Sequence, residues 1–344
     1  MDQGFPRFTV SDKAERSVRL GHPWVYDTEI LSGEGEDGCL ATVLNRKGRW
    51  LGTALFNSRS KIRLRLISRN TNDDFSESFF ERRLRHAVDY RRTVMGPDFS
   101  CCRLIFGEAD FFPGLTVDRF GSILVAQTLS LGMEQRKEMI FRLLIKILRE
   151  EGETIDALYE RNDVRIRELE GMEQGKGFFE MEGLSKDLSG VTEICENGIR
   201  YEVDYVNGQK TGFFLDQKYN RQAAARLAPG RRVLDCFTHT GAFALNAAKA
   251  GAEHVCAVDV SADALAMARK NAERNDLTGN MSFREANVFE LLTAMGDAKN
   301  REYDYIILDP PAFTKSHGTV HSAECGYHEI NRRAMQILPR GGYL

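Results

Sequence analysis

From Arg231 to the C-terminus, the hydrophobic positions follow two alternating patterns. Short apolar runs, typical of buried strands, alternate with apolar residues at the three-to-four spacing of helices. The predicted strands are Arg232–Phe237, His254–Val260, Met281–Ala286 and Tyr305–Leu308, and the predicted helices are Ala242–Ala250, Ser261–Asn275, Val288–Met295 and Ala323–Leu338. Because this alternation implies right-handed crossovers, it predicts a Rossmann-like α/β domain: a parallel sheet with helices on both faces.

The first 189 residues follow different patterns. Residues 1–70 contain β-prone runs between turn signals and predict a small β-barrel. Residues 71–189 mix helices with strand candidates and predict a central α+β domain. The runs that carry these predictions are Ala41–Asn45, Trp50–Phe56, Ile62–Ser68, Phe79–Met95, Ser122–Ser130, Met133–Glu150 and Ala157–Arg161. We therefore predict three domains: 1–70, 71–189 and 190–344.

Composition narrows the class of protein. With 42% hydrophobic and 28% charged residues, the chain is typical of globular proteins. No apolar run is long enough to span a bilayer, and the N-terminus lacks the features of a secretion signal. The seven cysteines include no C-x-x-C pair, which argues against a disulfide framework and indicates a cytoplasmic protein. His317, His321, Cys325 and His328 have partly helical spacing, but no metal is expected because they follow a loop of uncertain course.

Charge is unevenly distributed although the net charge is only −3. Residues 1–70 hold twelve Lys or Arg against eight Asp or Glu. Lys61, Arg63, Arg65 and Arg69 have near-alternate spacing, which would place several cations on one strand face. Two interpretations remain open at this stage, a solvated strand face and a contact with RNA.

Three acidic residues fall at the ends of predicted parallel strands, where α/β sheets bind ligands. Asp235 ends the first strand, Asp259 ends the second, and Asp309 follows the fourth, ahead of two prolines. Each alone could be a helix cap or a turn residue, but their order and spacing together indicate a nucleoside site. The loop Thr238–Gly241 lacks G-x-G-x-x-G, so NAD is the poorer candidate. A cationic sulfonium cofactor, S-adenosylmethionine, would gain from the nearby acids.

Longer motifs give a resemblance over most of the chain. They are Gly21–Tyr26, Phe106–Asp110, Pro113–Arg119, Tyr159–Asp163 and Gln209–Arg221. With these motifs the chain resembles the bacterial 23S rRNA cytosine-C5 methyltransferases that carry an N-terminal PUA domain, an RNA-binding β domain. The resemblance implies 23S ribosomal RNA as the partner and no membrane, while the strand-rich surfaces would suit RNA or a homodimer equally.

The resemblance also implies roles for individual residues. A cysteine thiolate adds to cytosine C6, and C5 then takes the methyl group. Asp309 is the catalytic residue that would hold the protonated cytosine N3. The residues expected to bind the cofactor are Gln209, Thr211, Phe213, Asp235, Phe237, Thr238, Gly241, Ala242, Asp259, Val260, Ser261, Asn287, Val288, Asp309 and Pro310. Two positions depart from the common pattern, because His239 replaces a glycine and Asn287 an acid.

The nucleophile is the larger departure. In the family it lies after a fifth strand, beyond the last residue, Leu344, so we expect a C-terminally truncated chain that binds cofactor without turning over. Two alternatives stay open. Asp309–Phe313 resembles the Asp-Pro-Pro-aromatic motif of base amino-group methyltransferases, with Ala312 inserted. A non-catalytic RNA-binding or ribosome-assembly protein with a retained cofactor fold would also lack the cysteine.

Overall fold

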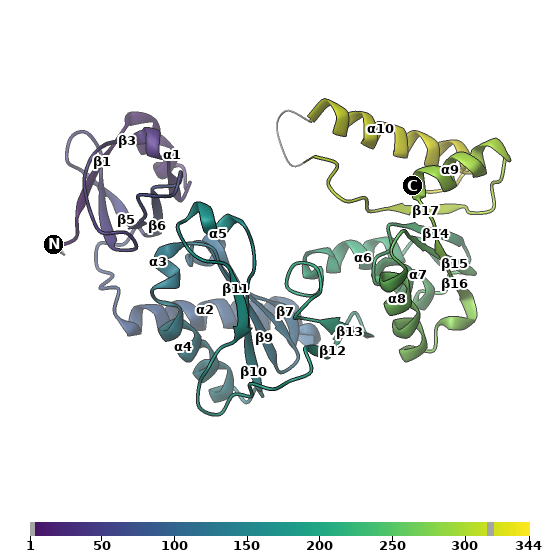
Figure 1. Ribbon diagram of the computed structural model, residues 1–344, viewed down its shortest axis with the longest axis horizontal. Helices are drawn as coiled ribbons and strands as arrows, with labels where there is room; N and C mark the ends of the chain where they lie inside the picture. Colours follow the sequence, from purple (N-terminus) through teal and green to yellow (C-terminus); the bar gives the residue numbers. More distant parts are fainter. Residues whose placement is uncertain (1–3, 315–319) are drawn as a thin grey trace. The chain divides into compact units, whose positions relative to one another are not determined.

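The computed structural model describes residues 4–314 and 320–344. The chain forms two compact units (Figure 1). The first comprises Met1–Thr192 and Val203–Phe213, and the second comprises Glu193–Glu202 and Phe214–Leu344. The boundary crosses the hairpin of β12 (Val191–Glu196) and β13 (Ile199–Asp204) twice, so each unit receives part of both strands.

The N-terminal part of the first unit is a six-stranded sheet in the order β2-β6-β5-β4-β1-β3. Its strands are β1 (Arg7–Val10), β2 (Trp24–Val25), β3 (Ile30–Ser32), β4 (Leu40–Leu44), β5 (Trp50–Phe56) and β6 (Leu64–Ser68). Helix α1 (Asp12–Arg19) was not predicted. Ser11 caps it by accepting a hydrogen bond from the Ala14 amide at 3.3 Å, and only Ala14 and Val18 are buried. Two buried positions are too few for a helical period to be visible in the sequence.

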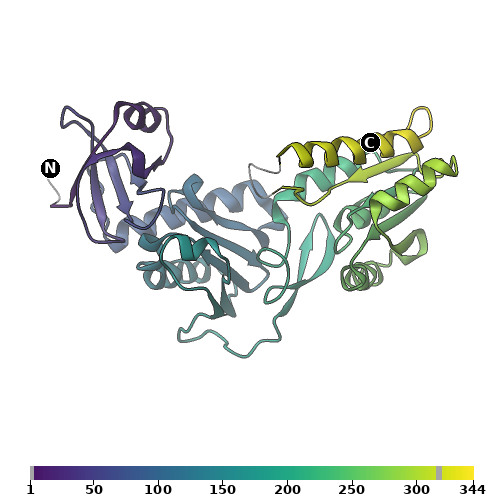
Figure 2. The same ribbon diagram turned by 45° about the horizontal axis from the view of Figure 1, so that its top comes forward.

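The central part has a five-stranded sheet in the order β11-β10-β9-β8-β7. Its elements are α2 (Glu77–Met95), β7 (Cys101–Phe106), β8 (Leu115–Phe120), β9 (Ile123–Thr128), α3 (Leu131–Glu134), α4 (Lys137–Glu150), β10 (Ala157–Asn162), α5 (Ile166–Leu169) and β11 (Gly175–Phe178). Helices α2 and α4 pack against each other (Figures 1 and 2), and their apolar faces share one core with the sheet. The helix predicted over 133–150 is interrupted, because α3 ends at Glu134 and α4 begins at Lys137.

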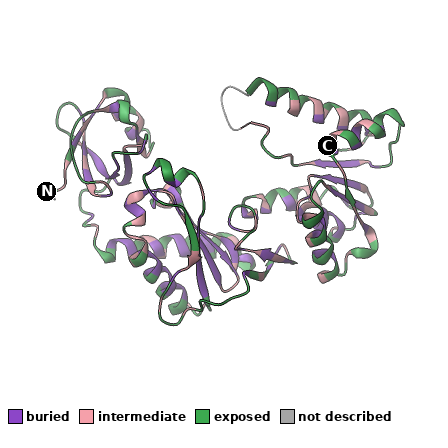
Figure 3. Cartoon of the chain, viewed as in Figure 1, coloured by how far each residue is buried: buried purple, intermediate pink, exposed green. Residues whose placement is uncertain are grey.

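The second unit confirms the predicted Rossmann-like fold. Four parallel strands lie in the order β16-β15-β14-β17. The elements are α6 (Lys218–Ala225), β14 (Arg232–Cys236), α7 (Ala242–Lys249), β15 (His254–Asp259), α8 (Ala262–Arg274), β16 (Met281–Glu285), α9 (Val288–Asp297), β17 (Tyr305–Leu308) and α10 (Val320–Ile337). Helices α9 and α10 share a core with one face of the sheet, and α7 and α8 contact the same strands. The central strands are almost wholly buried (Figure 3).

No helix in residues 4–314 and 320–344 has the length and apolar character needed to cross a membrane.

Arg65 corrects the prediction of a cationic strand face. Its guanidinium is buried and pairs with Glu170 at 2.8 Å and Glu108 at 3.4 Å. Glu170 also accepts a hydrogen bond from Ser60 at 2.5 Å, and Glu108 accepts one from the Trp24 indole at 2.8 Å. These contacts join the N-terminal sheet to the central part. The near-alternate spacing was misleading because, of the four predicted cations, strand β6 contains only Arg65. The charge of Arg65 is neutralised by ion pairs within the first unit.

We predict that Arg65→Ala destabilises the first unit by about 3 kcal/mol, because its removal leaves the buried Glu170 carboxylate and the half-buried Glu108 carboxylate without their cation. Arg142→Ala is the matched control, since Arg142 lies in an exposed pair with Glu138 and should change stability by less than about 0.5 kcal/mol. Urea unfolding followed by fluorescence of Trp24 and Trp50 measures both variants. Equal midpoints for the two would contradict this role of Arg65.

Candidate cofactor site

The three strand-end acids lie at one edge of the sheet. Strand β14 pairs in parallel with β15 on one side and β17 on the other, placing Cys236 opposite both Val258 and Leu308. Asp259 is the last residue of β15, and Asp309 directly follows β17. The negative charges of Asp259 and Asp309 both act to raise the pKa of Asp235. The register thus gathers all three carboxylates at the carboxyl end of the sheet, where such folds bind ligands.

Asp235 is the most constrained of these acids. Its side chain is 1% exposed, and Oδ2 accepts hydrogen bonds from the Thr238 hydroxyl at 2.5 Å and the Ala244 amide at 3.0 Å. Burial raises its pKa to about 7, against the opposing effect of these two bonds. Oδ1 is equally buried and has no hydrogen-bond partner among the described residues. A buried carboxylate oxygen without a donor is costly, so this atom is suited to a cationic or hydrogen-bonding ligand.

The loop after β14 turns sharply. Phe237, His239 and Gly241 all have positive φ angles, of 63°, 52° and 82°. The sequence suggested that Gly241 allows a close approach to ligand. The structure supplies a packing reason, because a Cβ at 241 would lie 2.9 Å from the Cβ of Ala268 in α8. Ala242 is the first residue of α7 and is 8% exposed.

Asp259 is held by backbone donors on both oxygens. Oδ2 accepts from the His239 amide at 2.9 Å, and Oδ1 accepts from the Ser261 amide at 3.0 Å. An ionised carboxylate has about four acceptor sites, so capacity remains for two ribose hydroxyls. Ser261 caps α8 through the Ala264 amide at 3.2 Å, and Val260 beside it is 62% exposed.

Asp309 and the residues after β16 occupy different environments. Asp309 is exposed and accepts a hydrogen bond from the side-chain Nε2 of Gln217 at 3.5 Å, and the half-buried Pro310 follows it. Asn287 caps α9 by accepting from the Phe289 amide at 2.9 Å. Val288 is 1% exposed and packs in the core, so its side chain is not available to a ligand.

Three residues predicted to cover the cofactor belong to the first unit. The Thr211 hydroxyl donates to Asp118 at 2.6 Å, Phe213 is 5% exposed, and Gln209 is exposed in the preceding loop. The next residue, Phe214, belongs to the second unit, and its ring lies edge-on to His239 with centroids 5.5 Å apart. The sequence predicted a covering role for Phe213, and the ring contact with His239 of the β14 loop is made by the neighbouring Phe214.

Within the described parts of the chain, no group of His, Cys, Asp or Glu is arranged to hold a metal ion. His321 and Cys325 lie on α10 with Nε2 and Sγ 4.0 Å apart. His317, which was weighed with them, lies outside the described residues.

Comparisons with known proteins agree with this geometry. Residues 174–344 match a family described as S-adenosylmethionine-dependent methyltransferase, and residues 8–69 match a PUA-like domain. The chain is 40% identical over 335 residues to ribosomal RNA large subunit methyltransferase I of Photobacterium profundum, covering 96% of the chain and 82% of the relative. The Klebsiella pneumoniae protein of the same name is 35% identical over 347 residues, covering 100% and 84%.

The chain belongs to the ribosomal RNA large subunit methyltransferase I family. A solved SAM-dependent methyltransferase from Streptococcus mutans has a TM-score of 0.78 and 24% identity, covering 97% of this chain and 83% of that one. Another methyltransferase structure, complexed with SAH, has a TM-score of 0.81 and 24% sequence identity, and the match covers 98% of this chain and 84% of that chain. These structures show that this member of the large subunit methyltransferase I family shares their fold.

We predict that affinity for S-adenosylmethionine rises roughly tenfold between pH 6 and pH 8, because the cationic ligand favours ionised Asp235, whose pKa is about 7. The stability of the free protein depends on pH in the opposite direction. A raised carboxyl pKa makes this group's contribution to the free energy of unfolding fall as pH rises from about 4 to about 7. Isothermal titration calorimetry measures the affinity, and Asp235→Asn should remove its dependence on pH. A profile that is the same in both proteins would refute the assignment.

Proposed function

We propose that the chain is an S-adenosylmethionine-dependent methyltransferase that forms 5-methylcytosine in large-subunit ribosomal RNA. The observation that carries the proposal is the gathering of Asp235, Asp259 and Asp309 at one sheet edge, where one buried oxygen of Asp235 has no hydrogen-bond partner in the described part of the chain. The named relatives support ribosomal RNA as substrate, and the PUA-like match at 8–69 supports RNA binding. In this proposal the parts 1–70, 71–189 and 190–344 act together in the cytoplasm, where ribosomal RNA is modified.

The residues at the edge fit the cofactor's chemistry. Asp235 Oδ1 would compensate positive charge, Asp259 would bind the ribose hydroxyls, and the backbone of the Phe237–Gly241 loop would border the ligand. When bound, the cofactor supplies a methyl group activated by its sulfonium. Thr238 and the Ala244 amide fix the Asp235 carboxylate before binding, so little reorganisation is required.

In this proposal Asp309 acts on the target base. It is exposed at the strand end, and the two prolines after it restrict the backbone of the exit loop. Its carboxylate would hold the proton at cytosine N3 while C6 is attacked, which lowers the electron density of the ring. Gln217, which donates to Asp309, orients the carboxylate for that contact. The target base must leave its stack to reach this edge.

None of the seven cysteines presents an accessible thiol at the strand-end edge, although Cys236 is the last residue of β14. Cys236 is buried in the core shared with α9 and α10, and burial raises its pKa well above the ordinary thiol value. Cys256 is buried in β15, and the remaining five lie in α10, in β12 or in the N-terminal and central parts. Since the thiolate is the nucleophile, reaction at C5 requires a thiol other than these seven.

The amino-group alternative is less favoured by the local packing. That chemistry needs an aromatic side chain free to stack on the target base. Phe313 instead packs against Tyr327, with centroids 4.5 Å apart, and against Phe289 at 5.8 Å.

The product identifies the reaction. We expect a form of the protein that supplies this further thiol to yield 5-methylcytidine when large-subunit RNA is treated with it and cofactor, digested and analysed by mass spectrometry. The 344-residue chain should bind S-adenosylmethionine, measured by thermal shift, without multiple turnover. A methylated exocyclic amine would refute reaction at C5, and multiple turnover by the 344-residue chain would refute the need for another thiol.

We predict that Asp309→Asn, in a form of the protein that supplies the further thiol, lowers the methylation rate at least a hundredfold, because an amide cannot balance the charge of a protonated base. Cofactor affinity should change only a few-fold. Single-turnover kinetics and calorimetry separate the two effects. Glu324→Gln, on the exposed surface of α10, is the control. Retention of the wild-type rate in Asp309→Asn would remove Asp309 from the mechanism.

A further inference from the structure

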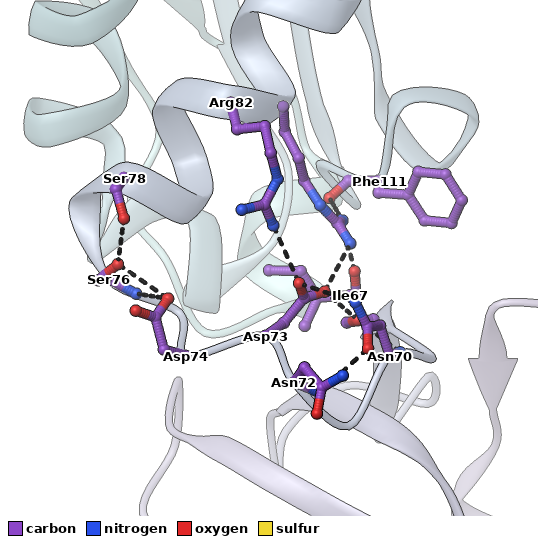
Figure 4. Close-up of polar contacts among 11 residues, drawn as sticks. Ile67, Asn70, Asn72, Asp73, Asp74, Ser76, Ser78, Arg82 and Phe111 are labelled. Atoms are coloured by element: carbon purple, nitrogen blue, oxygen red, sulfur yellow. Dashed lines mark hydrogen bonds and ion pairs between the residues drawn. The ribbon is translucent and has the colours of Figure 1, made fainter.

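A pocket of about 510 Å³ lies in the first unit, where the chain passes from β6 to α2 (Figure 4). Its walls include Arg69 after β6, Asp73 before α2, Arg82, Arg83 and His86 of α2, and Phe111 after the short helix Gly107–Asp110. The volume falls in the range of about 300–1,000 Å³ that is typical of sites for small ligands. None of these residues takes part in the proposed methyl transfer.

Positive charge in this pocket exceeds negative charge. The other arginines of α2 have their own carboxylate partners: Arg85 pairs with Glu81 and Glu150, Arg91 with Asp110, and Arg92 with Glu151. Asp110, which also lines the pocket, is therefore already compensated by the two short hydrogen bonds from Arg91, 2.7 and 2.6 Å long.

The pocket arginines share a single acid. Asp73 receives Arg82 at 2.9 Å and Arg83 at 3.6 Å, and the Ser68 hydroxyl donates to it at 2.6 Å. Arg69 donates to the His22 carbonyl at 3.3 Å and forms no ion pair with a carboxylate in the described part of the chain. His86 lies one helical turn after Arg82 on α2, on the same side of the helix. Three guanidinium groups in the pocket thus share the single carboxylate of Asp73, and this excess of positive charge suits an anion.

Arg83 forms the inner wall. Its guanidinium lies 4.3 Å from the ring centroid of Phe79 and 4.9 Å from that of Phe111. Burial lowers its pKa to about 10, so it remains a cation at neutral pH. Since this charge is partly desolvated, its attraction for an anion in the pocket is screened less than that of a surface arginine.

Phe111 offers an aromatic surface beside these cations. Its backbone is left-handed, with φ of 62°, and its side chain is 51% exposed. The Phe111 amide donates to the Glu108 carbonyl at 3.2 Å, which holds this uncommon conformation. In Figure 4 the ring projects away from Asp73 and Arg82. An exposed ring next to arginines provides the stacking and electrostatic contacts with which proteins bind single-stranded nucleic acid.

We propose that this pocket binds an unpaired nucleotide of the RNA substrate, with a phosphate on Arg69 and Arg82 and a base stacked on Phe111. The proposal rests on the proposed function only for the identity of the RNA. A free anion would need the arginines alone, whereas the exposed ring at the rim favours a ligand that also carries a base. An unpaired strand is favoured over a duplex, because stacked and paired bases offer no free face to the ring.

The test measures binding of a fluorescent single-stranded RNA from the large subunit, by anisotropy, to the 344-residue chain. We expect Phe111→Ala and the double variant Arg69→Ala/Arg82→Gln each to weaken binding roughly tenfold. Glutamine at 82 keeps a donor for Asp73. The double variant should also reduce the slope of log affinity against log salt by about 0.7 for each lost phosphate contact. Arg85→Ala, on the same helix but outside the pocket, should bind like the wild type.

Folding controls and three further results complete the test. Thermal unfolding and S-adenosylmethionine binding of every variant should match the wild type, which excludes general misfolding. Unchanged RNA binding in the pocket variants would overturn the proposal. The proposal would also be overturned if the variants weakened binding of inorganic phosphate or cytidine monophosphate but left RNA affinity unchanged, because the pocket would then be a site for a free anion. If the variants weakened binding of a fully paired RNA duplex as much as binding of the single strand, the preference for an unpaired nucleotide would be refuted.

Failure of the proposed function has a different signature. In that case no RNA would yield a methylated nucleoside, yet the pocket variants would still weaken RNA binding.

Discussion

The second unit depends on a carboxylate buried at the end of its central strand. Asp235 lies on a strand between two parallel neighbours and is shielded from water, and among the described residues it has hydrogen-bond partners on one oxygen only. An unpaired buried charge is tolerated in a fold when its cost is offset elsewhere, and a functional site is the common reason. The positive-φ loop, the oriented Asp259 and the start of α7 all surround this residue. The site is therefore largely formed before ligand arrives.

The motifs of the first unit that resemble the rRNA methyltransferase family mainly form hydrogen bonds and ion pairs between segments of that unit. Glu108 accepts a hydrogen bond from Trp24 and pairs with Arg65. Asp118 accepts hydrogen bonds from Arg103 at 2.7 Å and from the Thr211 hydroxyl. Arg161 donates to the carbonyls of Tyr205 and Gly208, at 3.2 and 3.0 Å. These contacts fix the segment 203–213 and the N-terminal sheet onto the central part. Residues that identify a family thus need not touch its substrate, and here they stabilise the arrangement of segments within one unit.

Much of the second unit was predictable from the sequence. Its strands are continuous apolar runs and its helices have clear periodicity, so element positions agree within a few residues, and the strand-end acids followed from the topology. The first unit was less predictable. Strands β7 and β8 contain charged residues such as Arg103 and Asp118, which pair with each other across the sheet and interrupt the apolar pattern of the strands. The fate of Arg65, and the difference between Phe213 and Phe214, depend on tertiary contacts that no local pattern records.

A crystal structure of the chain with S-adenosylhomocysteine would show where the ligand binds and which residues it contacts. We expect the nucleoside at the carboxyl ends of β14, β15 and β17, with its ribose hydroxyls on Asp259 and a donor or cation of the ligand next to Asp235 Oδ1. Ligand bound elsewhere, or bound there with Oδ1 still unpartnered, would contradict this expectation.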